Sequence, residues 1–273
     1  MGNQTSSGSA KGKKVVASKF NMASKTGVLN LSEQGLKQKS SVWSQLADEE
    51  LASKLKSLDL SQNSLKIIPA QVQSLLKLKT LIVSRCELTC LIDLRNLDQL
   101  TDIQAGDNYL GNGTLDGFPS SIQRCDLSMN RFSSFPLELI TLVNLRDLNL
   151  SGNALESVDG IGAMALLTHV HLDNNLLREL PVEIGELRKL KFISLKCNLI
   201  GPRAVTRDSQ SLPSGLFTDT SLDHIDLHGN ADLRKADVMG FEGVEVFLER
   251  RRKTKDKSVQ GGGLLDLTLF GIE

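Results

Sequence analysis

The sequence lacks the features that mark several classes of protein. Its 273 residues include no apolar run near the roughly 20 residues that a membrane helix requires, and no apolar segment near the N-terminus that would form a secretory signal. Four cysteines without a paired framework are typical of a reducing compartment. Basic and acidic residues balance at 32 each, which does not favour nucleic acid as a ligand. We therefore expect a soluble intracellular protein.

Aromatic residues are also scarce, at 4% of the chain, whereas leucine is abundant. A core made mainly of one aliphatic residue indicates a repeated unit. Comparing the chain with itself finds nine copies of Leu-x-x-Leu-x-Leu-x-x-Asn-x-Leu, the clearest of which start at Leu55, Leu145, Leu167 and Leu190. From the second copy to the eighth, the position of the asparagine recurs every 22 or 23 residues. The residues at this ladder position are Gln34, Asn63, Cys86, Asn108, Asn130, Asn153, Asn175, Asn198 and Asn230.

The repeat predicts its own local structure. In Leu-x-Leu, the two leucines share one face of a strand, and the residues beside them face the other way. One unit cannot bury its leucine face alone, so the units must stack into a continuous core. The ladder asparagine should turn inward, because its amide satisfies backbone groups where the chain leaves the strand.

This pattern resembles the leucine-rich repeat, whose ladder position takes Asn or Cys. The pairs Ile68-Pro69, Phe135-Pro136 and Leu180-Pro181 resemble the Ras-group style of repeat, with a short helical turn after the proline. The units after Leu88 and Leu155 lack that proline and are more similar to the phosphatase-regulator style. The resemblance implies an α/β leucine-rich-repeat solenoid, with a curved parallel sheet on the concave side and short helices or turns on the convex side.

A closer resemblance covers residues 25–255. The segments KTGVLNLSEQGL (25–36) and GFEGVEVFLERRRKTK (240–255) resemble the small leucine-rich-repeat-containing protein 57 type within the intracellular family. This implies a cytosolic, often acylated, non-enzymatic binding protein.

The predicted organisation has four segments. These are a disordered basic tail (1–24), the repeat array (25–235), a C-terminal capping helix (236–257) and a glycine hinge with an apolar tail (258–273). Residues 37–54 are expected to form a helix within an enlarged first unit. For the apolar tail two alternatives stay open, since it either folds back on the cap or docks elsewhere.

The residues beside each middle leucine should face outward from the concave sheet. His169 and His171 occupy two such positions, and all four histidines fall on or next to this face, around Phe192. Two interpretations remain, ordinary solvated positions or a protein-binding surface. A metal site is disfavoured because Phe192 interrupts the column of histidines. The candidate partner-binding residues are Arg124, Asp126, Asp147, His169, His171, Phe192, His224 and Asp226.

The N-terminus fits the myristoylation motif Met-Gly-x-x-x-[Ser/Thr], with Gly2 as the acceptor. One acyl chain gives only marginal membrane binding, so a second signal is needed. Lysines with no acidic residue before Glu33 provide positive charge toward an anionic leaflet, and a plain tail is the alternative. The lysines proposed to act this way are Lys11, Lys13, Lys14 and Lys19.

No phosphate loop and no nucleophile elbow are present, so we expect neither an enzyme nor a cofactor. The leading hypothesis is an adaptor that binds a partner protein on its concave face and is held at the cytoplasmic face of a membrane through Gly2. The alternative is a soluble regulatory subunit in a phosphatase or small GTPase pathway.

Overall fold

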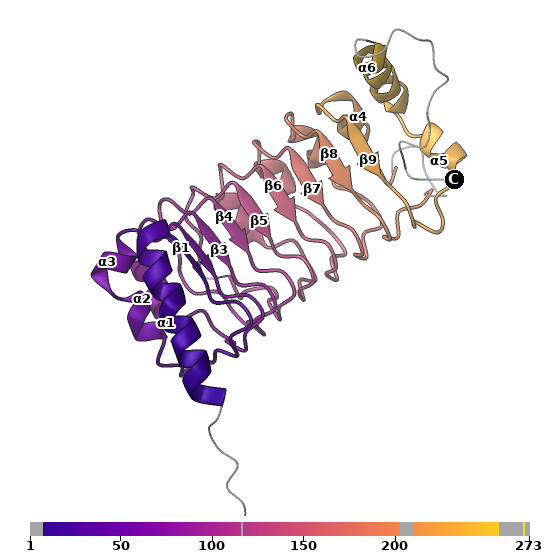
Figure 1. Cartoon of the computed structure of the whole chain (residues 1–273). Coiled ribbons are helices and arrows are strands. Elements are labelled where there is room, and N and C mark those ends of the chain that lie inside the picture. Colours follow the sequence, from indigo (N-terminus) through magenta and orange to yellow (C-terminus); the bar gives the residue numbers. More distant parts are fainter. Residues whose placement is uncertain (1–7, 116, 203–209, 257–269, 271–273) are drawn as a thin grey trace, which may run out of the picture. The chain divides into compact units, whose positions relative to one another are not determined.

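The computed structural model describes residues 8–115, 117–202, 210–256 and 270. The chain forms two compact units, residues 1–122 and 123–273 (Figure 1). Each unit contains parallel strands of three residues that follow one another in chain order. The repeat prediction is confirmed, because one strand forms at each of the nine copies.

Unit 1 begins with a long helix and holds four of the strands. Its elements are α1 (Gly8–Thr26), β1 (Val28–Asn30), α2 (Trp43–Leu46), α3 (Glu49–Ala52), β2 (Ser57–Asp59), η1 (Ala70–Ser74), β3 (Thr80–Ile82) and β4 (Asp102–Gln104).

Unit 2 holds the remaining strands and the C-terminal helices. Its elements are β5 (Arg124–Asp126), η2 (Leu137–Thr141), β6 (Asp147–Asn149), η3 (Ile161–Ala163), β7 (His169–His171), η4 (Val182–Glu186), β8 (Phe192–Ser194), α4 (Ser214–Thr218), β9 (His224–Asp226), α5 (Lys235–Met239) and α6 (Val244–Asp256).

The strand register places equivalent residues of each repeat side by side. In unit 1, Leu58 pairs with Leu81, and in unit 2, Val170 pairs with Ile193. These middle residues are fully buried, as are the leucines two positions later, such as Leu172 and Leu195. Complete burial of each such side chain contributes on the order of 2 kcal/mol. The core of each unit is therefore a stack of aliphatic layers, one layer per repeat.

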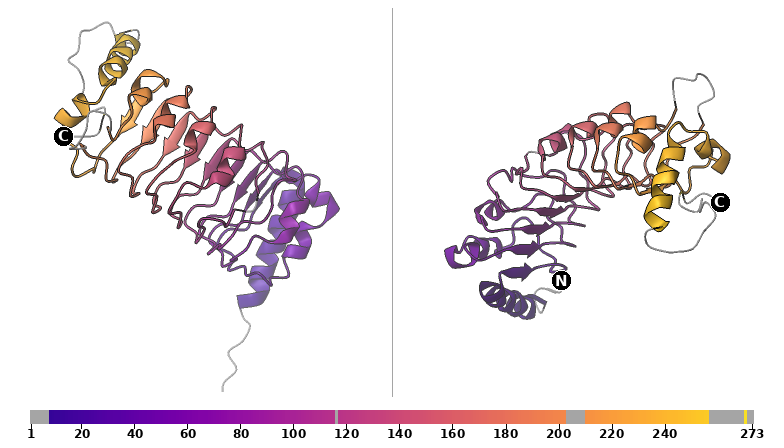
Figure 2. Two further views of the ribbon diagram at one scale, coloured as in Figure 1. Left: turned by 180° about the vertical axis from the view of Figure 1, so that it is seen from behind. Right: turned by 90° about the horizontal axis from the view of Figure 1, so that it is seen from above.

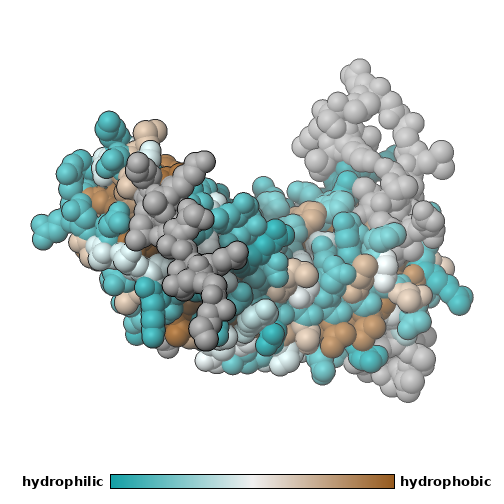
Figure 3. Space-filling view, turned by 60° about the horizontal axis from the view of Figure 1, so that its bottom comes forward, coloured by the Kyte–Doolittle hydropathy of each residue, from teal (hydrophilic) through white to brown (hydrophobic). Residues whose placement is uncertain are grey.

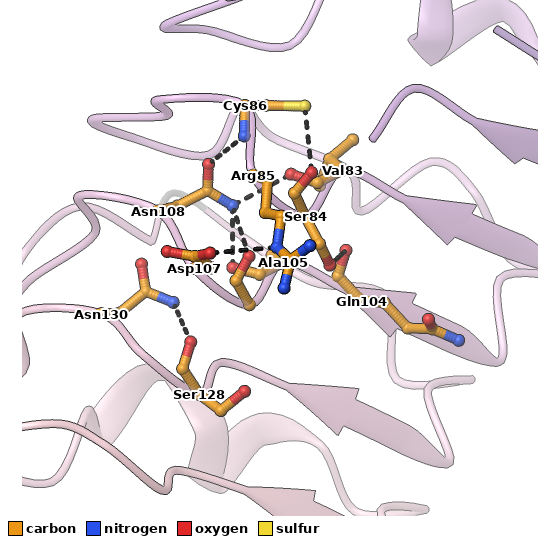
Figure 4. Close-up of polar contacts among 11 residues, drawn as sticks. Val83, Ser84, Arg85, Cys86, Gln104, Ala105, Asp107, Asn108, Ser128 and Asn130 are labelled. Atoms are coloured by element: carbon orange, nitrogen blue, oxygen red, sulfur yellow. Dashed lines mark hydrogen bonds and ion pairs between the residues drawn. The ribbon is translucent and has the colours of Figure 1, made fainter. Parts of the chain in front are cut away.

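The ladder asparagines turn into this core, as the sequence predicts. In unit 1, Asn108 donates from Nδ2 to the carbonyls of Val83 and Ala105, both at 2.9 Å, and its Oδ1 accepts the Cys86 backbone N–H at 3.0 Å (Figure 4). In unit 2, Asn198 bonds in the same way to backbone groups of its own repeat and of the one before it. Each amide thus satisfies backbone groups that the turn would otherwise leave unpaired in the core.

Cys86 replaces asparagine at one ladder position. Its thiol donates to the carbonyl of Leu60 at 3.1 Å, and burial raises its pKa to about 11. A neutral thiol therefore performs part of the role of the amide at this site.

The short helical turns follow the prolines as predicted. Pro69, Pro136 and Pro181 immediately precede η1, η2 and η4. The repeat after Leu155, which has no such proline, forms only the three-residue η3. In unit 2 these turns lie on the side of the repeats opposite the strands (Figure 2).

The N-terminal segment differs from the prediction of a disordered tail over residues 1–24. Residues from Gly8 onward belong to α1, which packs against β1 and α3. The physical reason lies in Phe20 and Ala23, which are three residues apart, share one helix face and are buried. The basic, polar composition of the segment hid this short apolar face. Residues 1–7, including Gly2, lie outside the described residues.

The predicted helices at both ends are each divided in two. Within residues 37–54, α2 and α3 replace a single helix, and Asp48 starts α3 by accepting the Leu51 N–H at 3.0 Å. Within residues 236–257, α5 and α6 are separated at Gly243, whose φ of +88° disfavours other residues. A Cβ on Gly243 would lie 2.9 Å from Thr218 Cγ2, so a side chain at this position would also collide with α4.

Phe270 shows where one residue of the predicted apolar tail lies. Its side chain is buried, with its ring centroid 5.8 Å from that of Phe247 in α6. Its carbonyl accepts the N–H of Leu227 at 2.9 Å. In the repeat before, the equivalent N–H of Leu195 donates to Asp226 at the end of the next strand. Phe270 thus takes the place that a tenth strand would occupy beside β9. The remainder of 257–273 lies outside the described residues.

Candidate functional site

The candidate site is the outward face of the five strands of unit 2, which we call the sheet face. Within each strand the first and third residues flank a buried middle residue, as the sequence predicts. Because the strands pair in register, the flanking residues form two rows across the sheet. The first row is Arg124, Asp147, His169, Phe192 and His224, and the second is Asp126, Asn149, His171, Ser194 and Asp226. All eight candidate partner-binding residues therefore lie on one face of one unit.

Four rings meet on this face and form what we call the ring cluster: His169, His171, Phe192 and His224. The ring of Phe192 lies 5.1 Å from that of His224, with the planes 6° apart. On its other side it meets His171 at 5.0 Å and His169 at 6.0 Å. The parallel register produces this arrangement, since it sets equivalent side chains about 4.8 Å apart.

The exposure of Phe192 differs from the sequence prediction. The sequence indicates an aromatic side chain open to solvent. In the structure Phe192 is half-buried, because imidazoles lie on both sides of its ring. His169 is the exposed member of the cluster. Its Nδ1 lies 3.0 Å from Thr168 Oγ1, a contact that orients the imidazole. A partner would therefore meet imidazole surfaces and the edge of the phenyl ring.

Several polar residues of the second row also have a structural role. Asp126, Asn149 and Asp226 each accept a backbone N–H two residues further on, at 2.9, 3.0 and 3.1 Å. These bonds close the turn that follows each strand. One carboxylate oxygen of Asp126 and of Asp226 is thus already engaged, a role that the sequence analysis did not assign.

Charged groups just beyond the strands complete the site, and they are not among the candidate residues predicted from the sequence. Lys196 Nζ forms an ion pair with Asp226 Oδ2 at 2.9 Å, and this hydrogen bond raises the pKa of Lys196. Asp173 accepts the hydroxyl of Ser194 and the Lys196 backbone N–H. The Ser194 side chain is consequently buried rather than solvated. Lys196 and Asp173 follow their strands by two residues, which is the only signal that would have found them.

The surroundings of His224 perturb the pKa of its imidazole. Burial against Phe192 lowers its pKa, and the positive charge of Arg251 in α6 lowers the pKa further. Asp226 acts in the opposite direction. The net effect favours the neutral imidazole beside Phe192.

The other predicted site residues belong to unit 1 or lie outside the described residues. Lys19 lies on α1 in unit 1 with a partly exposed side chain, and the backbone of Lys11, Lys13 and Lys14 belongs to the same helix. Figure 3 shows hydrophobic residues as separate patches on a largely hydrophilic surface. Across the described ranges, no group of three or more His, Cys, Asp or Glu side chains is arranged to hold a metal ion. No helix in that part of the chain is long and apolar enough to cross a membrane.

Comparison with known proteins agrees with this architecture. The family described as Leucine Rich Repeat matches residues 54–75. The chain is 28% identical over 237 residues to leucine-rich repeat serine/threonine-protein kinase 1 of Mus musculus, a match that covers 82% of this chain and 11% of the kinase. It is 32% identical over 201 residues to Tsukushi of Gallus gallus, covering 71% of this chain and 46% of that protein.

Among solved structures, an internalin (inlF) from Listeria monocytogenes superposes with a TM-score of 0.60 at 17% identity, covering 80% of this chain and 61% of the internalin. At this identity the likeness shows the fold alone. The chain spans less than half the length of each of the two curated relatives.

Proposed function

Because the chain is built from leucine-rich repeats, a fold that serves typically as a protein-binding module, we propose that it is a non-enzymatic adaptor that binds a partner protein through the sheet face of unit 2. The observation that carries this proposal is the ring cluster. Phe192 sits at its centre, ringed by three imidazoles and then by charged side chains. A central aromatic group with a polar rim is the usual anatomy of a binding hot spot.

The rigidity of the face supports the same role. The ring cluster stands on the paired strands β7, β8 and β9, whose middle residues are buried. Side-chain hydrogen bonds close the turn after β9 and the turn after the neighbouring β6. Side chains held in this way lose little conformational freedom when a partner docks.

The test compares the wild-type chain with a triple variant, Phe192→Ala with His169→Ala and His171→Ala, in affinity capture from cells. We expect the variant to lose the captured partner while its thermal unfolding midpoint stays close to that of the wild type. A matched variant on the opposite side of unit 2, Val182→Ala, changes an exposed side chain and should keep the partner. Equal capture by the triple variant would move the binding surface away from the sheet face.

We further propose that Gly2 carries a myristoyl group and that the adaptor is peripheral on the cytoplasmic face of a membrane. The motif Met-Gly-x-x-x-Ser and the lysines of α1 support this. Since α1 begins at Gly8 and is fixed to unit 1 through Phe20 and Ala23, only a short segment separates Gly2 from a docked helix. Acyl chain and lysines together supply the two signals that stable attachment requires.

Membrane fractionation of wild type and Gly2→Ala tests the tether, since alanine removes the acceptor glycine and leaves both repeat units unchanged. We expect Gly2→Ala to move from membranes to cytosol. Replacing Lys11, Lys13 and Lys14 with Gln should keep the acyl group but make attachment weaker and less sensitive to salt. If intact-mass analysis finds no acyl group on protein made together with an N-myristoyltransferase, the tether is wrong and the adaptor function remains.

A further inference from the structure

The charges of the sheet face differ between its two edges. On the strands and in the turns that follow them, four carboxylates (Asp126, Asp147, Asp173 and Asp226) outnumber two cationic groups (Arg124 and Lys196), which leaves two net negative charges. At the opposite edge, Arg146 and Lys191 precede β6 and β8 with exposed side chains, and Arg251 of α6 donates to the Asp223 carbonyl. Net negative charge therefore lies on the strands and in the turns that follow them.

This charge distribution favours a cationic ligand, and His169 and Asp147 form the candidate binding site for it, which we call the seat. They are register partners on neighbouring strands. One face of the His169 ring is turned toward Phe192, so its other face looks toward β6, on the side of Asp147. Asp147 makes no ion pair with any residue that the structure describes. A neutral ring face beside an unpaired carboxylate is an arrangement that attracts a planar cation.

Resting on the adaptor function proposed above, we propose that the partner presents an arginine-bearing basic segment, which docks over His169 and Asp147 while the imidazoles are neutral and dissociates when they become protonated. A guanidinium suits this seat better than an ammonium, because it stacks on a ring and pairs with a carboxylate at the same time. The molecule already tolerates cations at the rim of the cluster, where Lys196 pairs with Asp226 and Arg251 lies beside His224.

The release follows from the number of histidines. While the imidazoles are neutral, the strands of the sheet face and the turns after them carry two net negative charges. Protonation of His169, His171 and His228 adds three positive charges and reverses the sign to one net positive charge, whereas His224 takes up its proton later because its pKa is lowered. The charged groups that face the imidazoles are Asp147 on β6, Asp173 after β7, Lys196 after β8, Asp226 on β9 and Arg251 on α6. Histidine is the side chain that ordinarily changes charge between about pH 7.5 and 5.5, so binding is compared at these two pH values.

The test measures fluorescence anisotropy of labelled peptides that alternate glycine with arginine, with citrulline or with glutamate, titrated with the full-length chain. Citrulline keeps the shape of arginine without its charge. We expect the arginine peptide to bind at pH 7.5, and to bind at least about tenfold more weakly at pH 5.5. At pH 7.5 the dissociation constants of the citrulline and glutamate peptides should be at least about tenfold larger than that of the arginine peptide.

Matched variants separate this site from general attraction to an acidic surface. Asp147→Asn should weaken the arginine peptide severalfold, whereas Asp159→Asn, the same charge change in an exposed turn away from the strands, should not. The variant His169→Gln with His171→Gln and His224→Gln should bind the arginine peptide more weakly at pH 7.5, because the ring that stacks on the guanidinium is lost. The binding that remains should lose most of its pH dependence.

Three results of the peptide titrations would overturn the proposal. They are tighter binding of the glutamate peptide than of the arginine peptide at pH 7.5, equal effects of Asp147→Asn and Asp159→Asn, and no measurable binding of the arginine peptide at chain concentrations up to about 1 mM. Sedimentation that shows pH-dependent self-association through the sheet face would identify a second copy as the occupant and would also overturn it. If any of these occurs while the triple variant above still loses its captured partner, the adaptor function survives and only the basic character of the partner is wrong.

Discussion

Phe192 and His224 stack face to face on neighbouring parallel strands, with ring centroids 5.1 Å apart. The contact joins the binding face to the stability of the fold, because burial against Phe192 holds the imidazole in its neutral form. The protonation of His224 should therefore be measurable through the free energy of unfolding.

The expected effect is a dependence of stability on pH. Because the pKa of His224 is lowered in the folded state from its ordinary 6.5, the unfolded chain takes up the proton first as pH falls. The contribution of His224 is therefore fully present above about pH 6.5 and is lost as pH falls through the folded-state pKa. We expect His224→Gln to lose less stability than the wild type between pH 7.5 and 5.5. Urea unfolding at intervals across this range measures the difference, and identical pH profiles would contradict the lowered pKa.

The ladder amides should be the most sensitive polar groups of unit 2. Asn198 is buried and accepts the N–H of Leu177, so its loss leaves that N–H without its acceptor. It also donates to the carbonyls of Leu172 and Leu195, to which the amides of Asn175 and Asn230 donate as well. We expect Asn198→Ala to lower the free energy of unfolding by about 1–3 kcal/mol. Asp147→Ala on the sheet face should change it little. Chemical denaturation distinguishes the two, and similar effects would mean that the ladder does not support the core.

The cysteines should differ sharply in reactivity. Burial raises the pKa of Cys86 to about 11, so at pH 8 only about one thiol in a thousand is ionised. Cys197 is exposed. We expect iodoacetamide to label Cys197 in the folded chain and Cys86 only after unfolding, as read by peptide mass spectrometry. Rapid labelling of folded Cys86 would show that its repeat opens readily.

Phe270 should stabilise unit 2 although it lies far along the chain from the last strand. Its side chain is buried against Phe247, so Phe270→Ala should destabilise by about 3 kcal/mol through the cavity that it creates. The partly exposed Met239 provides the comparison, and Met239→Ala should have a small effect in the same thermal unfolding assay. Should the two variants unfold alike, the contact of Phe270 with α6 contributes nothing to the fold.

Much of this architecture is predictable from the spacing of a few residue types. Leucine or another small or apolar residue at alternate positions, followed three residues later by Asn, Gln or Cys, located all nine strands, and with them the two rows of the sheet face. Proline before each of η1, η2 and η4 located these turns. Such features depend on local geometry, so a single sequence is sufficient to find them.

The differences arise where a residue's role depends on distant groups. Among the described side chains of α1, the buried apolar ones are Phe20 and Ala23, and they become evident only once β1 is there to cover them. Likewise, the partial burial of Phe192 results from imidazoles on two other strands. The break between α5 and α6 reflects contact of Gly243 with Thr218 and Ser214, which sequence spacing alone cannot reveal.

The carbonyl of Phe270 has a consequence for assembly. A strand at the end of a repeat array presents unpaired backbone groups and an apolar layer, onto which another copy can add head to tail without limit. Here Leu227 already donates to Phe270, and the phenyl ring covers the layer beside Phe247. Phe270 thus occupies the backbone of the chain just after β9, which disfavours the addition of another copy at this end. Loss of the final residues, by proteolysis or by early termination of synthesis, would free the N–H of Leu227 and is expected to favour head-to-tail association at this end.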